Sequence, residues 1–218
     1  MIRITTLCLF LLTSLGLSAW QNNYEKVYTA RAHLERAQEL LEVNQLDSAR
    51  YHCEQALKKA PSYREVYIVT HKVYEAMEVE SSLKIENLKA GQEVSLQDEE
   101  LAYYLGQVYQ KEGASEEAIA AYSKAIDFSK ENDGEPQFRY YYYMGRGATY
   151  LLKRTYDKAL DDFSSALEID PDSGGALINR GFCYYNTKEK EKACDDWRKA
   201  SKLGRKDASN YIGKYCFE

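Results

Sequence analysis

A ladder of small and bulky residues returns along this 218-residue chain at a nearly constant interval. In its two clearest copies, glycine, alanine, an aromatic residue and a second alanine recur after 34 residues. These copies are Gly147, Ala159, Phe163 and Ala166, followed by Gly181, Ala193, Trp197 and Ala200. A period in the mid-thirties is typical of stacked helix pairs, each of which packs only on its neighbours. Such stacks bind other molecules and seldom catalyse.

Weaker copies of the ladder extend the pattern towards the N-terminus. Gly106, Ala118, Tyr122 and Ala125 repeat it upstream, and an earlier copy has Ala37 in the glycine position. We therefore predict an all-α fold of about five helix pairs over residues 24–218. The expected repeats lie near 30–63, 64–97, 99–132, 140–173 and 174–207, and a single capping helix is expected over 208–216.

Composition agrees with a helical, interaction-type protein. Hydrophobic residues make up 44% of the chain and only three residues are proline, which suits long helices. Tyrosine is unusually frequent, with 20 residues, and its ring offers an apolar face with a polar tip. The net charge is −5 and the basic residues are dispersed, so no nucleic-acid partner is expected.

The first residues have the layout of a secretory signal. Arg3 is followed by an apolar run and then by small residues, and we expect residues 1–19 to be cleaved after Ser18 or Ala19. The run is short for a bilayer span, which needs about 20 apolar residues. The expected location is periplasmic or secreted. The alternative is an uncleaved anchor formed by residues 4–20, which would then be the chain's contact with a membrane.

If the chain is exported, its cysteines can form disulfides. Without Cys8, the chain keeps Cys53, Cys183, Cys194 and Cys216, an even number that allows three pairings in an oxidising compartment. We favour a disulfide between Cys194 and Cys216, because 22 residues separate them and the bond would pin the last helix onto the final repeat. Cys53 occupies an aromatic position of the ladder and is expected to be a buried thiol.

Catalytic and metal-binding patterns are not apparent. The three histidines, His33, His52 and His71, stand far apart on expected helices, and none has a second ligand at metal spacing. The chain has no glycine-rich phosphate loop and no serine-centred elbow motif. We therefore expect no enzyme activity, no catalytic residues, no cofactor and no metal.

The ladder resembles the tetratricopeptide-repeat family, over roughly Ala30 to Asp207. The segments from Arg146 to Pro171 and from Arg180 to Ala200 match most specifically. The second repeat departs from the pattern, because His71 stands in the glycine position and Asn87 in the aromatic one. The early apolar segment and the run Ala193–Trp197 are similar to exported bacterial members. The resemblance implies a right-handed α-solenoid.

In this family the first helix of each pair lines a concave groove that binds peptides. Carried over position by position, the resemblance assigns the groove to Tyr103, Gln107, Tyr141, Met144, Ile178, Phe182 and Tyr185. Members that grip a C-terminal carboxylate use Lys, Arg and Asn there, so such a clamp is not expected on these aromatic and aliphatic positions. Because Tyr140 to Tyr143 are consecutive, they cannot all face the groove.

These observations predict a non-catalytic scaffold or adaptor outside the cytoplasm, which binds a partner peptide or helix in the concave groove. The alternative is a permanent structural subunit of an envelope or secretion assembly. The partner in either case is another protein.

Overall fold

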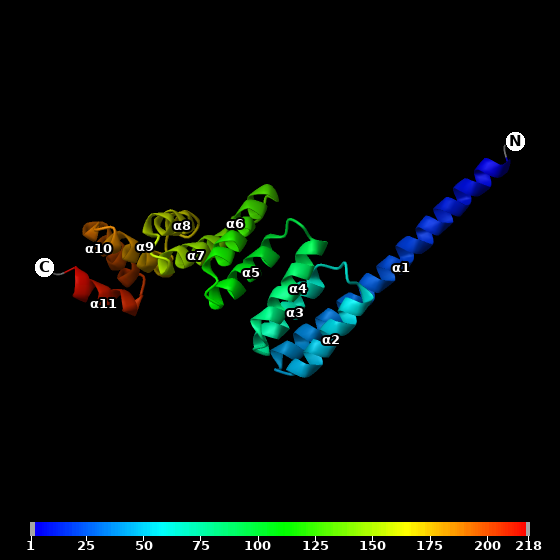
Figure 1. Cartoon of the computed structure of the whole chain (residues 1–218), viewed down its shortest axis with the longest axis horizontal. Helices are drawn as coiled ribbons and strands as arrows, with labels where there is room; N and C mark the ends of the chain where they lie inside the picture. The colour runs from blue at the N-terminus through cyan, green and yellow to red at the C-terminus, as the bar shows by residue number, and fades with distance from the viewer. Residues whose placement is uncertain (1–2, 217–218) are drawn as a thin grey trace. The chain divides into compact units, whose positions relative to one another are not determined.

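The computed structural model describes the backbone of residues 3–216 and the side chains of residues 21–216. Over this part of the chain the protein consists of helices joined by short turns (Figure 1). Two compact units are present, Met1–Ser95 and Leu96–Glu218. The all-α repeat fold predicted from the ladder is confirmed.

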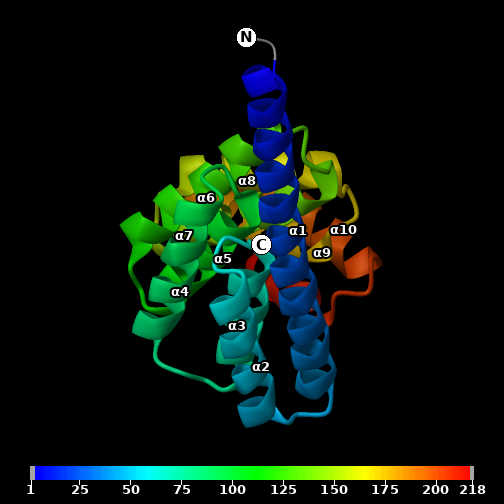
Figure 2. The same ribbon diagram turned by 90° about the vertical axis from the view of Figure 1, so that its right-hand side faces the viewer.

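The first unit contains four helices in two antiparallel pairs. They are α1 (Arg3–Glu42), α2 (Leu46–Lys59), α3 (Glu65–Ala76) and α4 (Ser81–Val94). Figures 1 and 2 both show α2 alongside the C-terminal half of α1. The predicted signal segment 1–19 lies outside the residues whose side chains the structure describes. Among the described residues, no helix is both long and apolar enough to span a membrane.

The second unit contains three helix pairs and a last single helix. They are α5 (Glu99–Lys111), α6 (Ser115–Glu131), α7 (Pro136–Leu152), α8 (Tyr156–Ile169), α9 (Gly174–Asn186), α10 (Lys190–Lys202) and α11 (Lys206–Tyr215). Each helix packs on the one that follows it in the chain. The unit is therefore built from local contacts, as a repeat array should be.

The glycines of the ladder allow the helices of each pair to cross closely. A Cβ on Gly106 would lie 2.6 Å from the ring of Tyr122, and one on Gly181 would lie 2.5 Å from Nε1 of Trp197. Tyr122 and Trp197 are 1% and 0% exposed, so they fill the space that each glycine leaves. The spacing of glycine and aromatic residue therefore reflects direct packing across the pair.

The divergent second repeat still forms a helix pair, with polar groups in its interior. His71 is 2% exposed, and burial lowers its pKa to about 4. Lys84 is equally buried and forms an ion pair with Glu75 at 2.6 Å. Asn87 donates a hydrogen bond to the carbonyl oxygen of Tyr67 at 2.8 Å. Polar side chains thus occupy positions that hold glycine and an aromatic ring in the three repeats of the second unit.

Candidate peptide-binding surface

The seven residues assigned to the groove all lie in the second unit, on the first helix of each pair. Tyr103 and Gln107 are on α5, one turn apart, while Tyr141 and Met144 are on α7. The other three are on α9, namely Ile178, Phe182 and Tyr185. Helix α7 contacts both α5 and α9, which brings the three groups next to one another.

On α5, Tyr103 joins the packing of three helices. Its ring centroid lies 5.1 Å from that of Tyr142 on α7 and 6.0 Å from that of Tyr122 on α6. The side-chain amide of Gln107 donates a hydrogen bond to the Tyr103 hydroxyl at 2.9 Å. Burial raises the pKa of Tyr103. Gln107 itself is exposed, so this turn of α5 presents an amide above a fixed ring.

On α7, the four consecutive tyrosines divide between core and surface. Tyr142 is 4% exposed, whereas Tyr141 is 53% exposed. Tyr140 and Tyr143 are half-buried. Tyr141 meets the ring of Tyr140 edge-on, at a centroid distance of 5.1 Å. Tyr141 is therefore the tyrosine of this run that is most available to a ligand.

On α9, the predicted groove residues pack partly against other parts of the protein. Ile178 is 6% exposed, and its carbonyl oxygen accepts a hydrogen bond from Nε1 of Trp197 at 3.2 Å. The ring of Phe182 lies 4.6 Å from that of Tyr211 on α11, and Tyr185 lies 4.6 Å from Tyr215. The last helix thus contacts this end of the assigned surface. Ile178 belongs to the core, and Phe182 is half-buried.

A disulfide holds the last helix in place. Cys194 on α10 and Cys216 at the end of α11 are joined, with an S–S distance of 2.08 Å. Cys53 and Cys183 are free and buried. Burial raises the pKa of Cys53 to about 11 and that of Cys183 to about 12, which keeps both thiols protonated and unreactive near neutral pH.

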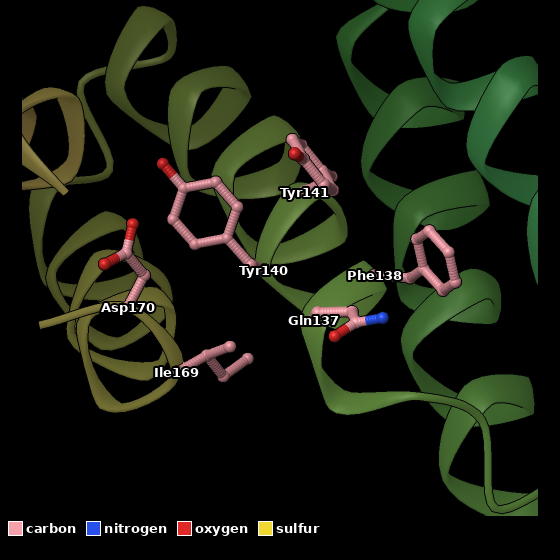
Figure 3. A pocket seen from close by; sticks show the side chains of 6 residues that line it. All are labelled: Gln137, Phe138, Tyr140, Tyr141, Ile169 and Asp170. Carbon is pink, nitrogen blue, oxygen red and sulfur yellow. The ribbon is translucent and has the colours of Figure 1, made fainter.

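The second unit also contains a pocket that the sequence did not indicate (Figure 3). Its volume is about 520 Å³. The lining residues come from the start of α7 and the end of α8: Gln137, Phe138, Tyr140, Tyr141, Ile169 and Asp170. The family resemblance assigns only first helices to the groove, so it gave no reason to include Ile169 or Asp170. Tyr141 belongs both to the assigned surface and to this pocket.

The expectation that the histidines lie far apart is wrong for one pair. His33 and His52 were expected to be far apart, but their Nδ1 atoms are 2.9 Å apart across the α1–α2 pair. Antiparallel pairing of the two helices brings together residues that the sequence separates. Within the described residues, no group of three or more His, Cys, Asp or Glu side chains is arranged to hold a metal ion.

Comparison with known proteins identifies the repeats. The family model described as the tetratricopeptide repeat matches residues 100–132 and 140–173. Residues 100–132 and 140–173 are tetratricopeptide repeats. The matched segments cover α5 with α6 and α7 with α8, the two pairs from which the surface around Tyr141 is built.

Two solved structures have a fold similar to that of this chain. The structure of MamA has a TM-score of 0.69 and 20% identity, with 87% of this chain and 97% of that chain covered. YrrB, described as a tetratricopeptide-repeat protein with an unusual peptide-binding site, has a TM-score of 0.68 and 23% identity, covering 84% of this chain and 90% of that chain.

A curated relative is similar over a shorter stretch. It is the CTR9 homolog of Arabidopsis thaliana, which is 32% identical over 111 residues. That match covers 51% of this chain and 10% of the relative. The chain therefore spans only a small part of the length of this relative.

Proposed function

We propose that the second unit binds a peptide segment or helix of a partner protein on the surface formed by α5, α7 and the accessible part of α9. A tetratricopeptide-repeat fold is an interaction scaffold, and YrrB, which has a similar fold, is described as having a peptide-binding site. The observation that carries the proposal is the exposure of Tyr141, at 53%, near the half-buried ring of Tyr103, whose hydroxyl accepts a hydrogen bond from Gln107. Exposed aromatic residues on a rigid support are typical anchors of protein interfaces.

Contacts within the fold support a proposed surface that is centred on α7. Tyr141 is 53% exposed, whereas Tyr185 is 38% exposed and contacts α11, and Phe182 is half-buried against the same helix. We therefore place the main anchor on α7 rather than on α9. Tyr103 acts as a support, because the Gln107 hydrogen bond and the Tyr142 contact fix its ring.

Replacing Tyr141 tests this function. Crosslinking in the native cell with the full chain should capture a partner, and Tyr141→Ala should reduce that capture by about tenfold or more. Tyr51→Ala is the matched control, because Tyr51 is similarly exposed, at 56%, but lies on α2. Both variants should melt like the parent protein. Equal capture by the two variants would reject the α7 surface as the binding site.

The proposed setting is outside the cytoplasm. The apolar segment 4–20 and the disulfide between Cys194 and Cys216 support it, because disulfides persist mainly in oxidising compartments. N-terminal sequencing of the protein from fractionated cells distinguishes a cleaved signal from an anchor. A chain that starts at Ala19 or Trp20 in the soluble extracytoplasmic fraction supports export and cleavage. An intact start in the membrane fraction supports the anchor, and a soluble cytoplasmic chain contradicts both.

A further inference from the structure

The pocket at the start of α7 combines an aromatic wall with a carboxylate. In Figure 3, Tyr140 extends towards Asp170, Phe138 lies on the opposite side of Gln137, and Tyr141 is drawn between Tyr140 and Phe138. Phe138 and Tyr141 are three residues apart on α7 and therefore share a face of the helix. They are 52% and 53% exposed, which leaves large parts of both rings accessible.

The aromatic wall is held in position by contacts within the fold. The Tyr140 hydroxyl and the Ser173 hydroxyl form a hydrogen bond of 2.6 Å, which ties α7 to the turn before α9. The ring of Tyr140 in turn supports Tyr141 edge-on. A ring that is already fixed loses little conformational freedom when a ligand binds.

The carboxylate of Asp170 is available to a cation. Asp170 is exposed at the C-terminal end of α8, where the partial negative charge of the helix dipole also favours a positive group. Its Oδ1 accepts a hydrogen bond from the backbone N–H of Asp172 at 3.2 Å. Among the residues that the structure describes, Asp170 forms no ion pair.

Two basic side chains of the neighbouring turns, Arg205 and Lys199, are paired with other groups. Arg205 donates two hydrogen bonds to Asp207, at 3.1 and 2.7 Å. Lys199 donates to the carbonyl oxygen of Pro171 at 2.6 Å and pairs with Asp172 at 3.3 Å. Neither of these two cations is bound between the Asp170 carboxylate and the aromatic faces of the pocket.

We propose that this pocket binds a lysine or arginine side chain of the partner peptide. An ammonium or guanidinium group is attracted both to a carboxylate and to the face of an aromatic ring, and the apolar stem of either side chain packs against rings. The net charge of −5 favours the approach of a basic segment. This proposal rests on the peptide-binding function above and assigns the chemistry of one position in the bound peptide.

Selection from a random peptide library displayed on phage tests the proposal directly. Peptides selected by the full chain should share a basic residue at one position. Their affinity should fall by about three- to tenfold with Asp170→Asn. Asp172→Asn is the matched control, because Asp172 lies in the same turn but does not line the pocket. Its effect should be less than twofold, and unchanged melting of both variants shows that the fold is intact.

A small probe separates the pocket from the rest of the surface. Titration of the full chain with N-acetyl-arginine methylamide, or its lysine analogue, should shift the backbone amide NMR signals of Tyr141 and Asp170. The uncharged norleucine analogue should shift them less, and Asp170→Asn should remove the difference.

The outcomes distinguish the two proposals. Selected peptides that lack a shared basic residue, or that bind the Asp170→Asn variant equally well, overturn the assignment of the pocket and leave the peptide-binding function standing. Failure to select any peptide, together with unaltered partner capture by Tyr141→Ala, overturns both. An equal response to the charged and uncharged probes also overturns the assignment of the pocket.

Discussion

Arg146 on α7 donates hydrogen bonds to both carboxylate oxygens of Asp162 on α8, with N···O distances of 2.9 and 2.7 Å. A third nitrogen of Arg146 donates a hydrogen bond to the hydroxyl of Ser123 on α6, at 2.8 Å. One guanidinium group thus ties the two helices of a repeat to the second helix of the preceding repeat. Burial raises the pKa of Asp162, and the contact with Arg146 opposes that shift.

The next repeat contains the same arrangement. Arg180 binds both oxygens of Asp196, each at 2.8 Å, and reaches Ser164 at 3.5 Å. In the repeat formed by α5 and α6, the corresponding positions are apolar. They are Leu105, 4% exposed, and Ala121, 7% exposed. The same position in the fold therefore accepts either a paired charge or a small apolar contact.

Replacing Asp162 alone should lower the free energy of unfolding more than replacing Asp162 and Arg146 together. Asp162→Ala leaves a half-buried guanidinium without its carboxylate, and we expect it to lower the free energy of unfolding by about 3 kcal/mol. Adding Arg146→Leu reproduces the apolar pair of Leu105 and Ala121 and should restore at least half of that loss. Urea unfolding of the single and double variants measures the coupling. Simple additivity of the two effects would contradict this account.

Gly181 should not tolerate a methyl group. The added Cβ of Gly181→Ala would lie 2.5 Å from Nε1 of Trp197, which is fully buried and has to shift. We expect a loss of about 1–3 kcal/mol in the free energy of unfolding. Gly213→Ala is the control, because no atom lies within 4 Å of its added Cβ, and it should stabilise α11 by about 0.5–1 kcal/mol. Equal effects at the two positions would show that the crossing is not tight.

The disulfide should stabilise the C-terminal end of the second unit. Cys216→Ser removes the bond to Cys194, and we expect a loss of about 3 kcal/mol in the free energy of unfolding under oxidising conditions. Phe182 and Tyr185 should become more accessible, because α11 is then held by packing alone. A reductant should destabilise the parent protein and leave the Cys216→Ser variant unchanged. A free thiol at Cys216 in the purified parent protein would contradict the pairing.

His71 should make the stability depend on pH below neutrality. Burial lowers its pKa to about 4, while the unfolded chain has a value near 6.5. Above pH 6.5 both states are neutral, and this group contributes no slope. As the pH falls from 6.5 towards 4, the unfolded state gains a proton that the folded state does not, which costs up to about 3 kcal/mol.

The charged groups around His71 act in both directions. Glu75 raises its pKa, whereas Lys84 and Lys72 lower it. Denaturation of the parent protein and of His71→Leu at pH 7 and pH 4.5 measures the contribution. The variant should lose most of the pH dependence and keep a smaller part from His52, whose pKa burial also lowers. Identical pH dependence in the two proteins would contradict the assignment.

The sequence alone determined the helix pairs and the positions at which they pack. The offset between Gly181 and Trp197 is fixed by local packing of two helices joined by a short turn, so periodicity in the chain is enough to reveal it. It also favoured the pairing of Cys194 with Cys216 that the structure contains. The family resemblance, added to that pattern, pointed to Tyr141 on a first helix.

Only the tertiary structure decided which of these side chains are accessible and which residues meet across helices. Ile178 is buried, and Phe182 lies against Tyr211, because α11 packs on α9 and α10. Asp170 joins Tyr141 in one pocket because the end of α8 lies beside the start of α7. Such contacts depend on the rotation of each helix and on the path of each turn, which periodicity does not specify.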